Sequence, residues 1–394
     1  MINIVNKVDC CGCEACSNAC PKKCIEMKSD EEGFLYPQVN QDTCINCGLC
    51  EKVCPIINHV PREKNDYQEA YLLQHKDDEI CRESTAGGAF TGIASYVIEK
   101  GGIVFGVEMT EGYKVRHTSV ETIDDLKKFR NSKYVQSRIG TVFQQVKHEL
   151  NKGRLVCFSG TPCQVEGLRH FLGKDYENLI LVDVVCRAVP SPGVWEKYIQ
   201  YEVEQKGEMS SVRFRDKTLG YQYSTMELKS NDGKAYRGGI ESQPWLRMFF
   251  SGMIIRPSCT DCKFRSRYRN SDFTIWDCFP SYKFDKSFNE RKGTTRVLVH
   301  SEKGKAIFET IKKEYYVSEI NADYAVSGVS EMVKSPQSNE KKNDFFEYYS
   351  SVQMDEILKM FFPYTVKVQV KRLLRRILNY LRLDVVVKKM LKRG

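Results

Sequence analysis

The sequence lacks any run of eighteen apolar residues, and its N-terminus has neither the apolar stretch nor the cleavage site of a signal peptide. These absences predict a cytoplasmic chain without a membrane-spanning helix. Its 17 cysteines would suggest disulfides in a small secreted domain, but the chain has 394 residues and no recognisable leader. In a reducing compartment, dense cysteine is typical of metal binding or redox chemistry.

Surplus positive charge is also missing from most of the chain, although the net charge is +9. Residues 364–394 contain ten Lys and Arg and a single acidic residue, Asp384, so this segment carries the whole surplus. The remaining residues are balanced in charge, which argues against a nucleic-acid partner.

Composition and hydrophobic periodicity divide the chain into four parts. Cysteine-rich residues 1–60 are followed by a polar linker, and apolar strands then alternate with amphipathic helices, which predicts parallel βαβ units. We expect an α/β (α+β) fold with domains at 1–60, 67–150 and 151–330, and a basic helical tail at 346–394. Within it we expect strands at 70–73, 103–107, 155–158 and 179–185, helices at 89–99, 140–151 and 161–172, and β-rich structure at 210–245.

The first sixty residues repeat one four-cysteine pattern, and each repeat ends in Cys-Pro. Three thiolates from a tight loop can hold three corners of a [4Fe–4S] cubane, while the fourth cysteine of each repeat ligates the other cluster. Paired zinc ribbons are the alternative, but zinc sites favour CxxC pairs separated by a longer span. The pattern predicts a bacterial-type ferredoxin domain with one cluster on Cys10, Cys13, Cys16 and Cys54 and another on Cys44, Cys47, Cys50 and Cys20.

Four further cysteines have a pattern that is open to two interpretations. Cys163 and Cys186 follow predicted parallel strands, at the edge where open α/β sheets build sites, and Cys259 and Cys262 form an isolated CxxC. The four thiols could hold a third [4Fe–4S] cluster. Alternatively, the first two are buried apolar residues and the CxxC binds zinc or nothing.

Two segments open predicted helices with small residues, at 84–88 and 159–161. Free N–H groups and the helix dipole favour a phosphate or a flavin at such positions. Ordinary N-capping by Ser84 and Thr161 is the commoner explanation of these residue types.

Five sequence blocks carry a resemblance to a known family. In order, they are STAGGAF (84–90), SKYVQS (132–137), SGTPCQV (159–165), VPSP (189–192) and residues 271–277. Over residues 67–330 they resemble the family of coenzyme F-420 hydrogenase/dehydrogenase beta subunits, in members with a fused ferredoxin domain.

Members of this family bind FAD and iron–sulfur clusters and pass electrons between ferredoxin-type clusters and an organic acceptor. The resemblance therefore implies a third cluster and an FAD site in this chain. By likeness to the family, the FAD site consists of Ser84, Thr85, Gly87, Gly88, Lys133, Tyr134, Gln136, Thr161 and Pro162.

The chain departs from the family pattern at two positions. Arg187 replaces a histidine after Cys186, and a fixed cation cannot shuttle a proton near neutral pH. Trp276 replaces a glycine before Asp277 and would fill space near the site. Cys278, two residues after Trp276, could also substitute for one of the four proposed ligands.

Residues 371–381 place apolar residues at helical spacing opposite Lys and Arg. Such a helix can lie on an anionic membrane surface, which would place the protein at the inner face of the membrane. The alternative is a helix docked on the protein itself with a solvated basic face.

We therefore expect an iron–sulfur flavoprotein, an oxidoreductase that passes electrons between its ferredoxin-type clusters and an FAD-linked organic substrate. Its partner would be a redox protein or a small electron donor. Resemblance to bacterial relatives found beside surface-polysaccharide enzymes suggests a sugar-linked substrate. The alternative, favoured by Arg187 and Trp276, is a non-catalytic electron-carrier subunit of a larger redox complex.

Overall fold

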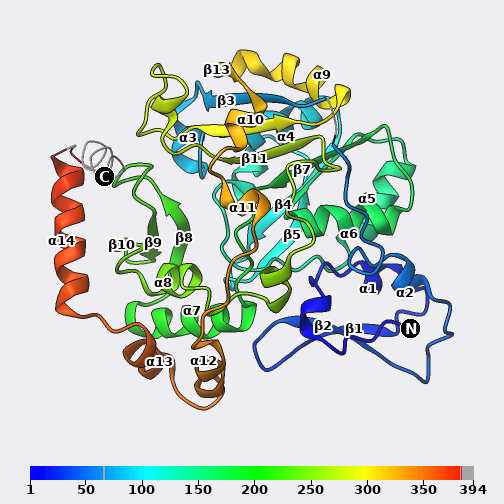
Figure 1. Cartoon of the computed structure of the whole chain (residues 1–394), viewed down its shortest axis with the longest axis horizontal. Coiled ribbons are helices and arrows are strands. Elements are labelled where there is room, and N and C mark those ends of the chain that lie inside the picture. Colours follow the sequence, from blue (N-terminus) through cyan, green and yellow to red (C-terminus); the bar gives the residue numbers. More distant parts are fainter. Residues whose placement is uncertain (65–66, 382, 384–394) are drawn as a thin grey trace.

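An eight-stranded mixed sheet forms the centre of the computed structural model, which describes residues 1–64, 67–381 and 383 (Figure 1). In sheet order the strands are β13 (Tyr315–Ile320), β3 (Glu69–His75), β12 (Thr295–Val299), β11 (Phe273–Asp277), β7 (Leu179–Val184), β6 (Val156–Gly160), β4 (Ile103–Met109) and β5 (Val115–Val120). Strands β4, β6, β7 and β11 run parallel to their neighbours within this group, and the other pairs are antiparallel.

Both faces of the sheet are buried because its central strands are apolar on both sides. In β4, Ile103 and Phe105 pack on one face and Val104 on the other. Helices α5 (Val142–Asn151) and α6 (Pro162–Leu172) cover the first face. Helices α4 (Ala89–Glu99) and α9 (Glu302–Ile311) cover the second. This three-layer arrangement confirms the α/β fold class predicted for the body.

The ferredoxin-like domain contains α1 (Ala15–Ala19), the antiparallel pair β1 (Ile25–Ser29) and β2 (Leu35–Val39), and α2 (Leu49–Lys52). It packs beneath α5 and α6 (Figure 1). The Glu14 carboxylate accepts the backbone N–H groups of Ile139 and Gly140 at 2.9 and 3.1 Å. Helix α6 approaches so closely that a Cβ on Gly167 would lie 2.8 Å from the Cβ of Cys13. The domain is therefore part of the packed body.

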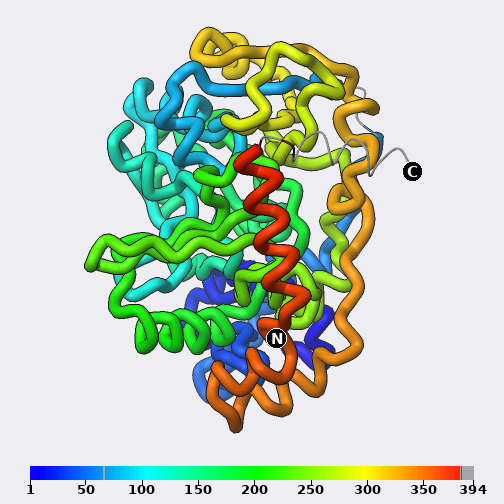
Figure 2. Tube along the Cα trace, turned by 90° about the vertical axis from the view of Figure 1, so that its left-hand side faces the viewer, coloured from blue at the N-terminus to red at the C-terminus, as the bar shows by residue number. Residues whose placement is uncertain are grey.

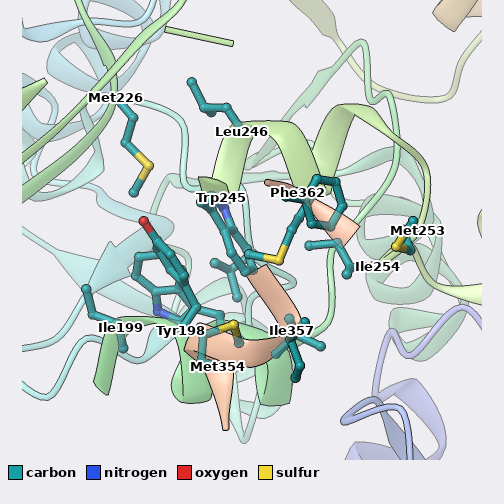
Figure 3. Close-up of a cluster of buried hydrophobic side chains, with 14 of the residues drawn as sticks. Tyr198, Ile199, Met226, Trp245, Leu246, Met253, Ile254, Met354, Ile357 and Phe362 are labelled. Carbon is teal, nitrogen blue, oxygen red and sulfur yellow. The ribbon is translucent and has the colours of Figure 1, made fainter. Parts of the chain in front are cut away.

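A second region surrounds a three-stranded sheet of β8 (Met209–Asp216), β9 (Thr225–Ser230) and β10 (Ala235–Gly239). Its core joins β8 and β9 to α7 (Pro192–Lys206), α8 (Pro244–Phe250), α12 (Lys342–Tyr349) and α13 (Met354–Phe361). Figure 3 shows Tyr198 and Trp245 beside Met354 and Ile357 in this core. Part of the segment predicted as a tail therefore packs into the body.

The remaining short elements connect these layers. They are the helices α3 (Asp78–Glu83), α10 (Ala322–Val326) and α11 (Ser330–Val333), and the 3₁₀ helices η1 (Lys7–Asp9), η2 (Asp124–Phe129), η3 (Pro257–Asp261), η4 (Ser281–Lys283) and η5 (Lys312–Glu314). Strands β4 and β6 pair directly, so the predicted boundary between domains 67–150 and 151–330 runs through the central sheet.

Helix α14 (Val366–Tyr380) lies on the outside of the molecule beside the three-stranded sheet (Figure 2). Its polar side faces the body. Arg372 donates to the carbonyl oxygen of Arg237 at 3.3 Å, and Arg375 forms an ion pair with Glu241 at 3.0 Å. Residues 382 and 384–394 of the predicted tail lie outside the described residues.

The apolar side of α14 faces away from the body. Leu373, Leu374 and Ile377 are 59%, 54% and 44% exposed, and the helix buries none of its residues. The docked-helix alternative is therefore met only in part: Arg372 and Arg375 contact the body, whereas Lys367, Lys371 and Arg376 are exposed together with the apolar residues. Within the described part of the chain, no helix combines the length and apolar character needed to cross a membrane.

Candidate functional site

The structure brings Cys20 from the first repeat to three cysteines of the second. With Cys44, Cys47 and Cys50 it lines one hollow near the N-terminus, and we call these four the second cysteine set. The backbone N–H of Ile2 donates to the Cys50 sulfur at 3.3 Å, and that of Cys24 to the Cys20 sulfur at 3.4 Å. Donors aimed at sulfur stabilise thiolate ligands, so this geometry fits the predicted crossed cluster.

The first cysteine set consists of Cys10, Cys13, Cys16 and Cys54. Burial and the neighbouring thiols of Cys10 and Cys54 raise the pKa of Cys16. Burial also raises the pKa of Cys54, with a further contribution from Cys10. These mutual effects show that the fourth cysteine of the second repeat lies with the first repeat. Because Cys50 of the second set also raises the pKa of both thiols, the assignment of Cys10, Cys13, Cys16 and Cys54 to one cluster stays a prediction.

The third cysteine set, Cys163, Cys186, Cys259 and Cys262, lines a single pocket between the sheet and the ferredoxin-like domain. Cys163 lies in the first turn of α6, and Cys186 lies just beyond β7. The CxxC pair reaches the same place because Ile255 pairs with Pro190 in an isolated antiparallel bridge. The N–H of Val189 also donates to the Cys259 sulfur at 3.5 Å.

Burial governs the chemistry of the third set. It raises the pKa of Cys186, Cys262 and Cys259, that of Cys259 to about 12, and the Cys259 thiol raises that of Cys186 further. The pKa of Cys163 is raised first by its hydrogen bond with Cys11 and then by burial. A metal centre would displace these protons on binding. Arg265 and Arg269 also line the pocket and offset the negative charge that four thiolates would bring there.

The spacing of these cysteines bears on the zinc alternative. Within residues 1–64, 67–381 and 383, no three His, Cys, Asp or Glu side chains meet closely enough to hold one metal ion. A single zinc ion needs its ligands gathered at about 2.0–2.3 Å from one centre. A cubane instead takes one thiolate on each of its four irons.

Two cysteines outside the three sets have different surroundings. Cys11, which lies between two ligands of the first cysteine set in sequence, interacts with the Cys163 thiol and lines the third pocket. It therefore connects the ferredoxin-like domain to the third set. Cys278 is buried beside Leu72 and Phe288, so the structure does not place it with the four proposed ligands.

The nine residues predicted to bind FAD fall into three neighbourhoods. The Thr85 hydroxyl meets that of Ser132 at 2.9 Å, which joins the 84–88 loop to the block at 132–137. Gly87 packs against β3, where an added Cβ would lie 2.0 Å from the carbonyl oxygen of Leu73. Gly88 has a φ of +83° and begins α4, while Ser84 is buried in the same loop.

The other five predicted FAD residues come later in the sequence, at 133–136 and 161–162. Lys133 donates to the carbonyl oxygens of residues 128 and 130, and the Tyr134 hydroxyl accepts from Arg215 at 3.2 Å. Gln136 donates to the carbonyl oxygen of Cys11 at 3.0 Å. Thr161 and Pro162 line the third cysteine pocket. Flavin binding by the nine residues stays a prediction.

Basic residues that the sequence reasoning missed surround the 82–88 loop. Arg213 donates to the carbonyl oxygen of Arg82 at 3.0 Å, and Arg130 forms an ion pair with Glu83 at 2.5 Å. Lys217 donates to the carbonyl oxygen of Ala86 at 2.6 Å. The alternation of Arg213, Arg215 and Lys217 at every second position of a predicted β segment was the signal that could have identified them.

This basic neighbourhood has unused hydrogen-bonding capacity. Among the described residues, Arg130 Nε, Arg213 Nε and Arg215 Nη2 are buried donors without a partner. Burial lowers the pKa of Lys217 to about 7, and the cations Arg215 and Arg213 lower it further. Buried donors and crowded cations fit an anionic ligand, such as the diphosphate of FAD.

Arg187 and Trp276, the two departures from the family pattern, both contact other side chains of the protein. Arg187 pairs with Glu331 at 3.3 Å and lies over the Phe250 ring, with its guanidinium carbon 5.3 Å from the ring centroid. Trp276 stacks beneath the guanidinium of Arg296 at 5.5 Å. Arg187 is therefore held by Glu331, and Glu331 lines the third cysteine pocket.

Comparisons with known proteins match two parts of the chain. Residues 153–324 match the family described as coenzyme F420 hydrogenase/dehydrogenase, C terminus of the beta subunit, and residues 9–56 match the 4Fe-4S dicluster domain. The F subunit of the F(420)H(2) dehydrogenase of Methanosarcina mazei is 22% identical over 44% of this chain and 51% of its own length. The coenzyme F420-dependent sulfite reductase of Methanocaldococcus jannaschii is 28% identical over 42% of this chain and 26% of its own length.

The chain thus spans about half of the first relative and about a quarter of the second. Among solved structures, a chain of the F420-reducing [NiFe] hydrogenase complex from Methanosarcina barkeri is similar with a TM-score of 0.45 and 15% identity. That similarity covers 66% of this chain and 84% of the other.

Proposed function

We propose that this iron–sulfur electron-transfer protein is a flavoprotein oxidoreductase with three [4Fe–4S] clusters. The proposal is supported by the match of residues 153–324 to the family of coenzyme F420 hydrogenase/dehydrogenase beta subunits and of residues 9–56 to the 4Fe-4S dicluster domain. When bound, the clusters supply one-electron transfer, and FAD couples it to two-electron chemistry on an organic substrate. The first, second and third cysteine sets hold the clusters.

One observation carries this proposal. Four cysteines from three separate segments line one pocket, and Cys11 of the ferredoxin-like domain lines it with them. Isolated buried thiols need no such convergence, whereas a shared metal centre does. The backbone donors to Cys20, Cys50 and Cys259 stabilise negative charge on the sulfurs.

The FAD diphosphate is proposed to bind at the basic neighbourhood around the 82–88 loop. Arg213 and Arg130 both contact this loop, and the Nε of each is a buried donor that has no partner in the described part of the chain. Thr85 and Ser132 supply hydroxyl groups at the same place. In this arrangement the cations neutralise the diphosphate, and Gly88 allows the chain to turn into α4.

A non-catalytic electron-carrier subunit is the second candidate function, and the ion pair between Arg187 and Glu331 favours it. A guanidinium that pairs with Glu331 and stays charged cannot exchange protons with a substrate near neutral pH. Such a subunit would hold the clusters for a partner protein. Retention of FAD by the purified chain distinguishes the enzyme from this carrier.

Anaerobic purification followed by iron, sulfide and flavin analysis tests the proposal. We expect about twelve iron atoms, about twelve sulfides and about one FAD for each chain, because each cubane contributes four irons and four sulfides. About twelve irons without flavin would favour the carrier subunit. A reproducible value near four, or zinc in place of iron, would contradict both candidates.

We also propose that α14 attaches the protein to an anionic membrane surface. Its apolar side is exposed, and Lys367, Lys371 and Arg376 are exposed along the same helix. A helix that faces solvent with apolar residues flanked by basic ones suits the interface of an anionic bilayer. The ion pair between Arg375 and Glu241 fixes the other side to the body and keeps the apolar side outward.

Full-length protein should sediment with vesicles that contain phosphatidylglycerol at low salt. The three exposed basic residues should contribute about 3 kcal/mol to the free energy of membrane binding, at about 1 kcal/mol each. Salt reduces this contribution, because it screens charges that lie further apart than a Debye length of about 8–10 Å. Replacing Leu373, Leu374 and Ile377 with glutamine should abolish sedimentation, while iron and flavin contents stay unchanged.

Two controls accompany the vesicle experiment. Vesicles of neutral phosphatidylcholine should bind little of either protein, and replacing exposed Tyr316 of β13 with glutamine should leave binding unchanged. If the unaltered protein stays in the supernatant with anionic lipid at every salt concentration, the membrane proposal is wrong and a protein partner becomes the better explanation of the exposed side.

A further inference from the structure

Arg256 is a completely buried cation between the ferredoxin-like domain and the body, with 0% exposure. Its guanidinium donates to the carbonyl oxygens of Cys10 and Leu35 at 2.8 and 3.0 Å and to the side-chain oxygen of Gln136 at 3.0 Å. It also reaches the Cys10 sulfur at 3.6 Å and lies over the Tyr36 ring at 4.3 Å. Every direction around the cation is therefore filled by protein.

No carboxylate in the described part of the chain forms an ion pair with Arg256. The comparably buried Arg269 and Arg215 do have such partners, in Asp183 and Asp277, each at 2.8 Å. A buried charge without compensation is costly, by several kcal/mol even after relaxation. The Glu14 carboxylate interacts with this cation without forming an ion pair, and the Cys10 sulfur is the candidate negative group that Arg256 contacts directly.

Arg256 also contacts the third cysteine set through its backbone. Its carbonyl oxygen accepts the N–H of Cys259 at 3.0 Å, and its own N–H donates to the carbonyl oxygen of Val189 at 2.9 Å. On the opposite side, a Cβ on Gly12 would lie 2.7 Å from the guanidinium, so the ligand loop packs directly on the cation. One residue thus spans the junction between the first and third cysteine sets.

We infer that Arg256 is a positioning residue whose fixed positive charge raises the reduction potential of the first cysteine set's cluster. This inference rests on the proposed function. One-electron reduction adds one negative charge to the cluster, and a nearby cation stabilises the more negative form. Arginine stays protonated throughout, so no proton accompanies the electron. Because the site is buried, bulk salt screens this interaction only weakly.

Redox titration of the anaerobic full-length protein, followed by EPR, tests the inference with dithionite as the electron source. We expect Arg256→Met to lower the one-electron reduction constant of one cluster at least tenfold, which corresponds to a shift of about −59 mV. The affected signal should be the one that a Cys16→Ala variant loses. The second cysteine set's cluster should keep its potential.

Two variants separate charge from packing. Arg256→Lys keeps the positive charge and should retain most of the potential. Gln136→Glu changes almost no volume but places a negative group against the guanidinium, so it should lower the same potential as Arg256→Met does. This second variant keeps the test decisive if Arg256→Met fails to assemble its cluster.

A matched control removes another cation from the same domain junction. Lys342 pairs with Glu32 at 2.8 Å, so the double variant Lys342→Met and Glu32→Gln weakens docking without changing charge beside Cys10. We expect it to leave all potentials unchanged. Unshifted potentials in both Arg256→Met and Gln136→Glu would overturn the inference. Loss of iron from the unaltered protein would instead contradict the proposed function.

Discussion

Replacing Cys262 with serine should remove about four of about twelve iron atoms from anaerobically purified protein. The four thiols of the third cysteine set line one pocket and come from α6, the end of β7 and the η3 segment. Burial opposes the thiolate form of these cysteines, so the negative sulfurs are stable there only while they are bound to iron. A cubane that loses one of its four thiolate ligands should therefore not persist in this pocket. Iron and sulfide analysis, together with EPR of the reduced protein, measures the loss.

The first and second cysteine sets should keep their clusters in the same variant, because their ligands lie within the ferredoxin-like domain. Cys262→Ala provides a stricter version, since an alanine has no oxygen that could replace the sulfur. Cys278→Ala is the matched control, for this buried cysteine lies beside Leu72 and Phe288 and should leave the iron content at about twelve. Equal iron contents in the unaltered protein and both Cys262 variants would refute the third cluster.

Replacing Arg213 with alanine should weaken FAD binding about ten- to hundredfold. Its guanidinium contacts the carbonyl oxygen of Arg82 and has a further buried Nε donor with no partner among the described residues. A hydrogen bond to a charged group contributes about 1.5–3 kcal/mol, and each 1.4 kcal/mol changes Kd by about tenfold. Flavin fluorescence during titration of the flavin-depleted protein gives Kd directly.

Arg213→Lys should recover part of the lost affinity because it keeps the charge but not the fork of donors. Lys152→Ala removes one exposed cation from the end of α5, far along the chain from the 82–88 loop, and should leave Kd unchanged. If Arg213→Ala retains FAD with the affinity of the unaltered protein, the diphosphate does not bind at this basic neighbourhood.

Much of the central sheet could be predicted because its elements carry local signals. Glycines on both sides of residues 89–99 predict the bounds that α4 has in the structure. Helix α6 likewise begins with Thr161, Pro162 and Gln164, where a capping box fixes its start. Each of these signals acts over a few residues, so no knowledge of distant contacts is needed.

The convergence of the third cysteine set was only partly accessible to such reasoning. Parallel strands end at one edge of a sheet, which predicts that Cys163 and Cys186 lie near each other. The position of the CxxC pair depends on the bridge between Pro190 and Ile255, a contact between distant segments that spacing does not reveal. The sequence therefore indicated four candidate ligands, and their alternative of zinc or no metal stayed open.

Two other features depend on contacts that have no local signal. Arg256 precedes the CxxC pair as an ordinary basic residue, and its isolation from carboxylates follows from the docking of the ferredoxin-like domain. The 371–381 pattern correctly predicts a helix, α14, but the ion pair between Arg375 and Glu241 decides which side faces outward. Amphipathic periodicity gives the two faces of a helix without stating which of them the body covers.

The docking of the ferredoxin-like domain has a kinetic consequence. A free ferredoxin must diffuse to its enzyme, find one orientation and leave again, and its delivery rate depends on its concentration. Here Glu14 is hydrogen-bonded to the backbone at 139–140, and Gly193 donates to the carbonyl oxygen of Gly33 at 3.2 Å, so the carrier is permanently in place. Tethering replaces a bimolecular encounter with an intramolecular one. With the proposed clusters bound, electron exchange between this domain and the body should therefore be first order and independent of dilution, whereas the external donor and the organic substrate must still reach the protein by diffusion.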